Sequence, residues 1–363
     1  MAKKLSADRT LFAVTIGLVF FGLVMLYSAS AVVADAAHRS SYFFLIKQSL
    51  WAAVGLLVMA VLMRLDYRRL RQPVLVYGFL LLSVVLLIAV LFFPPLKNAH
   101  RWLRFELLSF QPSEMAKLSL ILTVAYLLDQ KRDRIDDFFA GLFLPLVVTA
   151  FLAFLVLIEP DFGTASCLVF VGFCLFFVAG APFRYLVGFV AGAAPLAYLL
   201  IVRVDYRRDR LMAFIDPFAD PLGRGFQIIQ SLIAVGTGGI LGAGFMRSRQ
   251  KLFYLPEPHT DFIYSVIGEE LGLLGTLAVL GAFVVLLWRG VVIARRAPDL
   301  FGALLASGLT ALIVGQALIN MGVSLGVLPT TGIPLPFISA GGSSLATSLA
   351  AVGLLLGISQ HAR

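Results

Sequence analysis

The chain contains little charge and lacks the common catalytic motifs. Of its 363 residues only 13% are Asp, Glu, Lys or Arg, while 60% are apolar; soluble globular domains carry about 25% charged residues, so a soluble protein is excluded. HExxH, paired CxxC, GxSxG and P-loop patterns are missing, which leaves zinc protease, serine hydrolase and NTPase functions without support. Cys167 and Cys174, the only cysteines, lie seven apart in one apolar run and are interpreted as packing residues.

Long apolar runs make up most of the chain. Each is about 20 residues long, the length of a membrane-spanning helix, and none alternates as outer-membrane strands do. Helices satisfy their backbone hydrogen bonds internally. We therefore predict an all-α polytopic membrane protein, a single domain over 1–363, with ten transmembrane helices and a large extracytoplasmic loop at 203–261 between spans seven and eight. The runs fall near 10–34, 43–63, 74–95, 113–129, 138–158, 164–180, 185–202, 262–288, 301–327 and 340–358.

Lys and Arg in the short connections predict the orientation. They cluster before span one and after spans two, four and eight, and such clusters face the cytoplasm. Both termini are therefore expected in the cytoplasm, with the connections 96–112, 203–261 and 328–339 outside. Because the net charge of +9 is dispersed, anionic lipids are expected partners and nucleic acid is not. The clustered residues are Lys3, Lys4, Arg9, Arg64, Arg68, Arg69, Arg71, Lys131, Arg132, Arg134, Arg289, Arg295 and Arg296.

The stretch 253–272, FYLPEPHTDFIYSVIGEELG, concentrates charge at the entrance of span eight. Asp261 falls where the loop gives way to the helix, and an ionisable group at such a border is a candidate functional residue. An Asp directly before a helix is also typical of an N-cap, so that alternative stays open. Glu269 and Glu270 lie about two turns deeper and are expected to tie span eight to its neighbours.

Two further groups of charged residues lie in or beside spans. Glu114 and Lys117 are three residues apart on one face of span four, where unpaired charges are costly. A structural ion pair and a functional role are both open for them. Glu159 and Asp161 follow span five, and Asp161 is a candidate partner of Lys117 across the bundle.

The outward connections combine positive charge with rigid backbone. The loop 203–261 holds seven arginines and Lys251, and residues 326–344 hold three prolines and four glycines. Non-helical backbone at a membrane border is tolerated where it lines a cavity or is buried in protein, so the last loop is expected to form a shaped wall. Together with Asp261, these surfaces suit a lipid-linked, negatively charged substrate such as a polyprenyl pyrophosphate.

Five strings resemble, in order and spacing, the SEDS family (shape, elongation, division and sporulation) of bacterial peptidoglycan polymerases. The match covers nearly the whole chain. The QKLFYLPE approach and the PTTGIPLPFIS loop are more similar to the division-type members than to the elongation-type members. The strings are YSAS at 27–30, QPSEMAKL at 111–118, DPFADPLGRGFQIIQS at 216–231, QKLFYLPEPHTDFIYSVIGEELG at 250–272 and LPTTGIPLPFISAGGSS at 328–344.

The resemblance implies a ten-helix glycosyltransferase of the bacterial cytoplasmic membrane that polymerises lipid II on the extracytoplasmic face during septal cell-wall synthesis. It also implies a class B penicillin-binding protein as the crosslinking partner, and other division membrane proteins. Asp261 matches the family's essential aspartate. Thr331 and Ala340 stand where the family often has Lys and Tyr, so no role is transferred to them. Other positions that match functionally important residues are Glu114, Lys117 and Asp161.

On this basis, Asp261 is the candidate general base for inverting attack of the acceptor GlcNAc 4-hydroxyl on the donor MurNAc. Undecaprenyl pyrophosphate leaves, and basic side chains or a divalent cation, Mg²⁺ or Mn²⁺, are expected to stabilise its charge. The candidate substrate-binding residues are Arg101, Glu114, Lys117, Asp161, Arg207, Arg208, Arg210, Gln227, Gln230, Lys251, His259 and Ser343.

Three other functions remain open. A transporter that flips lipid II is expected to carry its essential groups at mid-membrane, as Glu114 and Lys117 suggest, whereas a polymerase carries them at the outer rim. A non-catalytic scaffold that recruits the transpeptidase is expected to tolerate Asp261→Asn. An elongation-type polymerase would perform the same chemistry in another cellular process.

Overall fold

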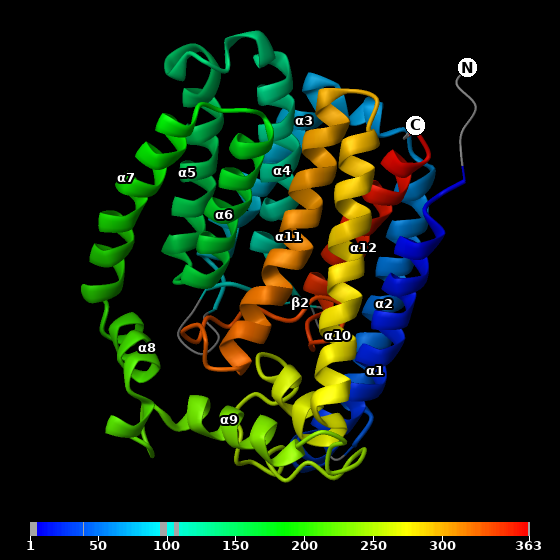
Figure 1. Ribbon diagram of the computed structural model, residues 1–363, viewed down its shortest axis with the longest axis vertical. Helices are drawn as coiled ribbons and strands as arrows, with labels where there is room; N and C mark the ends of the chain where they lie inside the picture. Colours follow the sequence, from blue (N-terminus) through cyan, green and yellow to red (C-terminus); the bar gives the residue numbers. More distant parts are fainter. Residues whose placement is uncertain (1–5, 39, 95–99, 105–108, 362–363) are drawn as a thin grey trace.

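The computed structural model describes residues 6–38, 40–94, 100–104 and 109–361 and is almost entirely helical (Figure 1). The predicted all-α class is confirmed, apart from a two-residue antiparallel pairing of β1 (Leu103–Arg104) with β2 (Ser109–Phe110). The α-helices of the described residues are α1 Arg9–His38, α2 Phe43–Arg64, α3 Pro73–Val90, α4 Pro112–Gln130, α5 Phe143–Ile158, α6 Phe162–Val178, α7 Phe183–Val202, α8 Asp205–Ile215, α9 Phe226–Gly238, α10 Ile263–Arg296, α11 Leu300–Ser324 and α12 Gly342–Ser359. Shorter helical turns are η1 Tyr67–Arg71, η2 Arg132–Arg134, η3 Phe138–Leu142 and η4 Pro217–Ala219.

Each of the ten predicted runs corresponds to one long helix, from α1 to α7 and from α10 to α12. Within the described ranges, eight helices are long and apolar enough to cross a membrane. The remaining two are α4, which carries Glu114, Lys117 and Asp129, and α6, which has 17 residues. These helices are typical of a multi-pass membrane protein, and the count of ten spans stays a prediction.

The start of α1 and the end of α12 lie at the same end of the bundle (Figure 1). Segments far apart in the sequence are joined there by polar contacts: Arg71 pairs with Asp129 at 2.6 Å, and Arg289 Nε donates to Asp8 at 2.8 Å. The basic connections after spans two and eight therefore share one end with the end of α4 and the start of α1, as the orientation prediction requires. The side of the membrane that this end faces stays a prediction. Lys3 and Lys4 lie outside the described residues.

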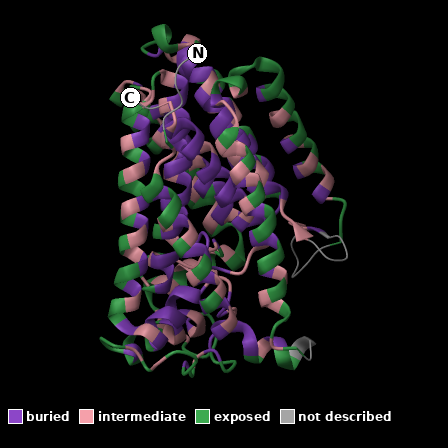
Figure 2. Ribbon diagram, turned by 90° about the vertical axis from the view of Figure 1, so that its right-hand side faces the viewer, coloured by how far each residue is buried: buried purple, intermediate pink, exposed green. Residues whose placement is uncertain are grey.

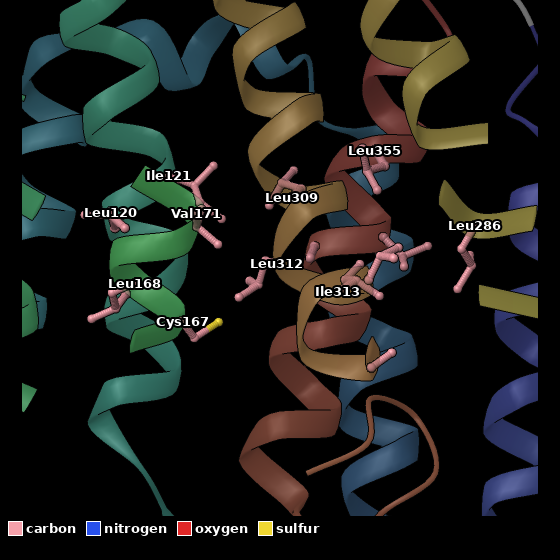
Figure 3. Packing of buried hydrophobic residues seen from close by; sticks show 14 of the residues in the cluster. Leu120, Ile121, Cys167, Leu168, Val171, Leu286, Leu309, Leu312, Ile313 and Leu355 are labelled. Atoms are coloured by element: carbon pink, nitrogen blue, oxygen red, sulfur yellow. The ribbon is translucent and has the colours of Figure 1, made fainter. Parts of the chain in front are cut away.

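The centre of the bundle is packed by apolar side chains of α4, α6 and α11. Figure 3 shows Leu120 of α4, Leu168 of α6 and Leu312 of α11 within one buried cluster, and Figure 2 shows exposed residues on the outer faces of the helices. Small residues allow close helix approach in membranes. Gly308 of α11 is one, because a Cβ added there would lie 2.7 Å from the Ile121 side chain of α4.

Helix α10 is broken at Gly272, a feature that the apolar pattern did not predict. Gly272 has φ 65° and ψ −160°, a backbone conformation open almost only to glycine. The loop 239–244 crosses the break: Ala243 N donates to the Glu269 carbonyl, and Leu273 N donates to the Gly239 carbonyl, both at 2.9 Å. Such breaks are tolerated at membrane depth when neighbouring backbone restores the lost hydrogen bonds.

The predicted loop 203–261 contains α8, η4 and α9, and α9 lies across the end of the bundle opposite the termini (Figure 1). Ser231 of α9 fixes it there: its hydroxyl lies 2.6 Å from the Ser265 hydroxyl of α10 and donates to the Ser324 carbonyl of α11 at 2.7 Å. The part of the loop that forms α9 is therefore packed against α10 and α11.

Candidate active site

A groove of about 1210 Å³ opens where α10 begins, at the end of the bundle opposite the termini. Its walls come from α2, residues 101–102 and 109–111, α8, α9, the approach to α10, α11 and the last loop. Four predicted site residues meet in it: Arg101, Arg210, Gln227 and Asp261. Other side chains and backbone in its lining include Lys47, Trp102, Gln111, Tyr206, Glu257, Asn320, Thr331, Gly332, Ala340 and Ser344.

The backbone that carries Asp261 is held by side chains from α11 and the last loop. Asn320 Nδ2 donates to the Asp261 carbonyl at 2.8 Å and to the Ile333 carbonyl at 2.9 Å. Ser339 Oγ donates to the Thr260 carbonyl at 2.6 Å. These bonds fix Asp261 against the last loop, and the expectation that this loop forms a shaped wall is confirmed.

The Asp261 side chain belongs to the groove and not to the helix end. Helix α10 begins at Ile263 with Phe262 at the N-cap position and no side-chain cap, so the N-cap alternative for Asp261 is wrong. A Cβ added at Gly332 would lie 3.6 Å from Asp261 Oδ2, which places the carboxylate beside the glycine of the PTTG turn. The carboxylate is partly exposed to the groove.

Asp161 stands behind the groove wall as the N-cap of α6. It accepts hydrogen bonds from Thr164 N at 3.1 Å and from Thr164 Oγ1 at 2.9 Å. Gln111, which lines the groove, donates to it at 3.2 Å, and an Arg101 nitrogen lies 4.0 Å away. Asp161 therefore orients two groove residues, Gln111 and Arg101.

The candidate pairing of Asp161 with Lys117 is wrong. Lys117 Nζ pairs instead with Glu114 at 2.8 Å within α4, and both side chains are buried. Charges at this depth are costly unless paired. The two charges therefore compensate each other, and neither residue is among those that line the groove.

Three arginines bring positive charge to the groove and its rim. Arg101 Nε donates to the Glu159 carbonyl at 3.1 Å, and an Arg210 nitrogen donates to the Thr330 carbonyl at 3.0 Å. The Arg207 guanidinium lies over the Phe162 ring, 5.4 Å from its centroid. Burial and the nearby charge of Arg101 lower the pKa of Arg207. Main-chain carbonyls orient Arg101 and Arg210 without cancelling their charge. Asp161, 4.0 Å from Arg101, offsets the charge of Arg101 only in part, which leaves positive charge for an anionic ligand.

Lys251, which was predicted to bind substrate, is not among the residues that line the groove. Its Nζ pairs with Glu270 at 2.7 Å and donates to Ser28 Oγ of α1 at 3.1 Å, and its side chain is 4% exposed. Glu269 accepts the main-chain N–H of Arg249 at 2.8 Å. The expectation that Glu269 and Glu270 tie span eight to its neighbours is confirmed, and Lys251 belongs to the same tie.

The other predicted residues surround the groove without lining it. Arg208 pairs with Asp205 on the exposed side of α8 at 3.0 Å. His259 is buried, with its ring 4.7 Å from the Phe44 ring, and its carbonyl accepts from Ala340 N at 2.9 Å. Gln230 is half-buried on α9. Ser343 is buried, and its neighbour Ser344 lines the groove in its place.

Sequence reasoning missed several groove residues. Lys47, Tyr206 and Glu257 line it. In the sequence Lys47 is a single charge within an apolar run, and Tyr206 and Glu257 stand in polar stretches that do not single them out. Asn320 gave a detectable signal, because an amide deep within an apolar span needs a partner. In each case the sequence does not tell which helix the side chain faces.

The groove offers few ligands for a metal ion. Among the described residues, no three His, Cys, Asp or Glu side chains gather closely enough to hold one, although Glu257 and Asp261 both line the groove. Magnesium is commonly held by one or two carboxylates together with substrate phosphates. The groove residues could therefore hold a cation only together with the phosphates of a bound substrate.

The fold and the groove define a multi-pass helical membrane protein with a charged site at one end of its bundle. Residues 8–363 match the profile of the FtsW, RodA and SpoVE family, described as cell cycle protein. The chain belongs to this family.

Several relatives and solved structures are similar to the chain over nearly its whole length. A probable peptidoglycan glycosyltransferase FtsW of Geobacter metallireducens is 44% identical, covering 97% of this chain and 94% of the relative. Stage V sporulation protein E of Bacillus subtilis is 43% identical, covering 99% of each chain. A chain of a peptidoglycan synthase complex, studied for the structural coordination of polymerization and crosslinking, superposes with TM-score 0.81 at 34% identity, covering 98% of both chains. RodA of Thermus thermophilus superposes with TM-score 0.72 at 31% identity, covering 98% of this chain and 97% of that chain.

Proposed function

We propose that the chain is a division-type peptidoglycan glycosyltransferase that polymerises lipid II during septal cell-wall synthesis. The observation that carries this proposal is the groove, where a partly exposed carboxylate, Asp261, lies with Arg101 and Arg210. Glycosyl transfer from a diphosphate donor needs this pairing of a proton acceptor with cations for the leaving group. The family membership and the similarity to probable peptidoglycan glycosyltransferases support the assignment.

Asp261 acts as the general base. It takes the proton of the acceptor GlcNAc 4-hydroxyl while that oxygen attacks the anomeric carbon of the donor MurNAc from the face opposite the leaving group. The bond between the anomeric carbon and the diphosphate oxygen breaks, and the configuration inverts. Asn320 fixes the backbone of the base through its bond to the Asp261 carbonyl, which limits movement away from the attacking hydroxyl.

The undecaprenyl pyrophosphate that leaves is stabilised by Arg101 and Arg210, with Arg207 beside them. Their guanidinium groups are already oriented by carbonyl oxygens, so little reorganisation is needed when charge develops on the diphosphate. Gln227 lines the same groove as a neutral substrate contact. A divalent cation shared with the diphosphate would add further charge stabilisation.

The orientation and the partners form the remaining parts of the proposal. The chain lies in the bacterial cytoplasmic membrane with both termini inside and the groove on the extracytoplasmic face. It works beside a class B penicillin-binding protein that crosslinks the glycan and with other division membrane proteins. The superposition on a chain of a peptidoglycan synthase complex supports a crosslinking partner.

Reconstituted vesicles containing lipid II test the proposal against a flippase. The purified protein, alone and with its class B partner, is expected to produce glycan strands that are resolved by electrophoresis. Translocation of lipid II without strand formation in both samples would replace the polymerase by a transporter. The closed ion pair of Glu114 and Lys117 favours the polymerase, because it leaves no unpaired charge there to relay an ion.

A further inference from the structure

Glu159 is a buried carboxyl group directly behind the groove. It follows α5 and precedes Pro160, which lines the groove. Its side chain is 0% exposed, and among the residues that the structure describes neither carboxyl oxygen has a hydrogen-bond partner. Asp161, two residues further on, receives hydrogen bonds from Thr164 and Gln111. Two neighbouring carboxyl groups therefore occupy opposite environments, one stabilised as an anion and one not.

The charged groups around Glu159 do not neutralise it. Arg101 donates to the main-chain carbonyls of Glu159 and Pro160 and lies 4.0 Å from Asp161; within the described part of the chain, no ion pair reaches the Glu159 carboxyl group. Helix α4 packs against α5 and α6, and the only cationic residue of its sequence, Lys117, already forms an ion pair with Glu114. An ionised carboxylate is strongly disfavoured in such a setting.

We propose that Glu159 is a positioning residue that stays uncharged, and thereby keeps the positive charge of Arg101 available to the diphosphate of the leaving group. This inference rests on the proposed function. An ionised Glu159 would place a second carboxylate beside Asp161, and Arg101 would then be drawn toward the pair. With a neutral Glu159, the guanidinium has one carboxylate at 4.0 Å and keeps net charge toward the groove. Glu159 touches no substrate atom in this role.

The protonation of Glu159 gives the inference a pH dependence. Burial and the charge of Asp161 raise the pKa of Glu159 to about 9, and Arg101 opposes the shift only in part. Because the pKa is raised, the acid is protonated at neutral pH and ionises as the pH rises through about 9. Diphosphate binding is therefore expected to weaken at alkaline pH, and Glu159→Gln, which cannot ionise, is expected to remove that weakening.

The experiment measures the affinity of farnesyl diphosphate for the full-length protein in nanodiscs, at neutral pH and at about pH 9.5. If only the neutral acid supports binding, the affinity of the wild type is expected to fall about fourfold at the higher pH. The affinity of Glu159→Gln is expected not to show this fall. Arg101→Gln, the matched control, is expected to bind weakly at both values. Equal pH dependence in the wild type and Glu159→Gln overturns the inference.

Infrared spectroscopy of the wild type provides a readout that does not depend on the variant folding. The carbonyl stretch of a protonated carboxylic acid is distinct from that of a carboxylate, so titration through pH 9 is expected to convert one band into the other. Where Glu159→Gln folds, the protonated band is expected to be reduced in it. Absence of a protonated acid that titrates in this range contradicts the inference. A protein that shows the band and the pH dependence but makes no glycan would contradict the proposed function alone.

Discussion

Replacing Lys251 is expected to destabilise the protein without removing a substrate contact. Lys251 Nζ pairs with Glu270 at 2.7 Å and donates to Ser28 at 3.1 Å, and the two charged side chains are 4% and 0% exposed. In Lys251→Met, Glu270 would remain buried with hydrogen bonds from the Ser28 hydroxyl and the Ser248 N–H and with no counter-charge. Breaking a buried ion pair from one side costs about 3–5 kcal/mol.

Neutralising both partners should restore most of this loss. In the double variant Lys251→Met with Glu270→Gln, the Gln side chain is neutral and still accepts a hydrogen bond from Ser28. Removing both charges of a buried pair is often close to neutral, within about 1 kcal/mol. The matched exposed pair, Arg208 with Asp205, is expected to contribute less than about 1 kcal/mol when Arg208→Met is made.

Thermal unfolding in detergent and lipid II polymerisation, measured on the same samples, separate the two roles of Lys251. The single variant is expected to unfold at a lower temperature and to lose activity, and the double variant to recover both. A double variant that is as stable as the wild type but fails to polymerise would refute the reasoning, because Lys251 would then act on the substrate. Full stability of the single variant would refute the buried pair.

Two other substitutions test the backbone around the site. Gly272→Ala is expected to prevent folding or sharply reduce the yield of monodisperse protein, because φ is 65° and the added Cβ would collide with backbone of the crossing loop. The control Gly281→Ala, in open space on the same helix, should leave the yield unchanged. Equal yields of the two variants would contradict the kink. Asn320→Ala removes the amide that bonds to the Asp261 and Ile333 carbonyls and is expected to cost about 1–3 kcal/mol and to lower kcat. Ser307→Ala on α11 should change neither, and an unaltered kcat in Asn320→Ala would rule out this support for Asp261.

The helices were predictable because their signal is local. An apolar run of membrane-spanning length specifies a helix almost regardless of its neighbours. The break at Gly272 was not predictable, since it depends on the loop 239–244, which supplies the missing hydrogen bonds from some thirty residues earlier. A glycine in an apolar span is common in membrane helices, so its presence alone does not indicate a kink.

The candidate site was predictable where polar residues lie in the outward connections, as Arg101, Arg210, Gln227 and Asp261 do. Lys251 fits that rule equally well in sequence, yet it faces Glu270, because a lysine near the site gives the same pattern whether its partner is a substrate or a buried glutamate. Glu159 is the opposite case: its burial depends on how α5 and α6 pack, and sequence spacing carries no information about that.

The rate of lipid II polymerisation by Asp261→Asn tests the central claim most directly. Asn has nearly the shape of Asp but cannot accept the proton of the attacking hydroxyl, so the thermal unfolding midpoint should be unchanged while the rate falls about 10²–10⁴-fold. Polymerisation within about twofold of the wild type, at equal folding, would contradict the assignment of Asp261 as the general base.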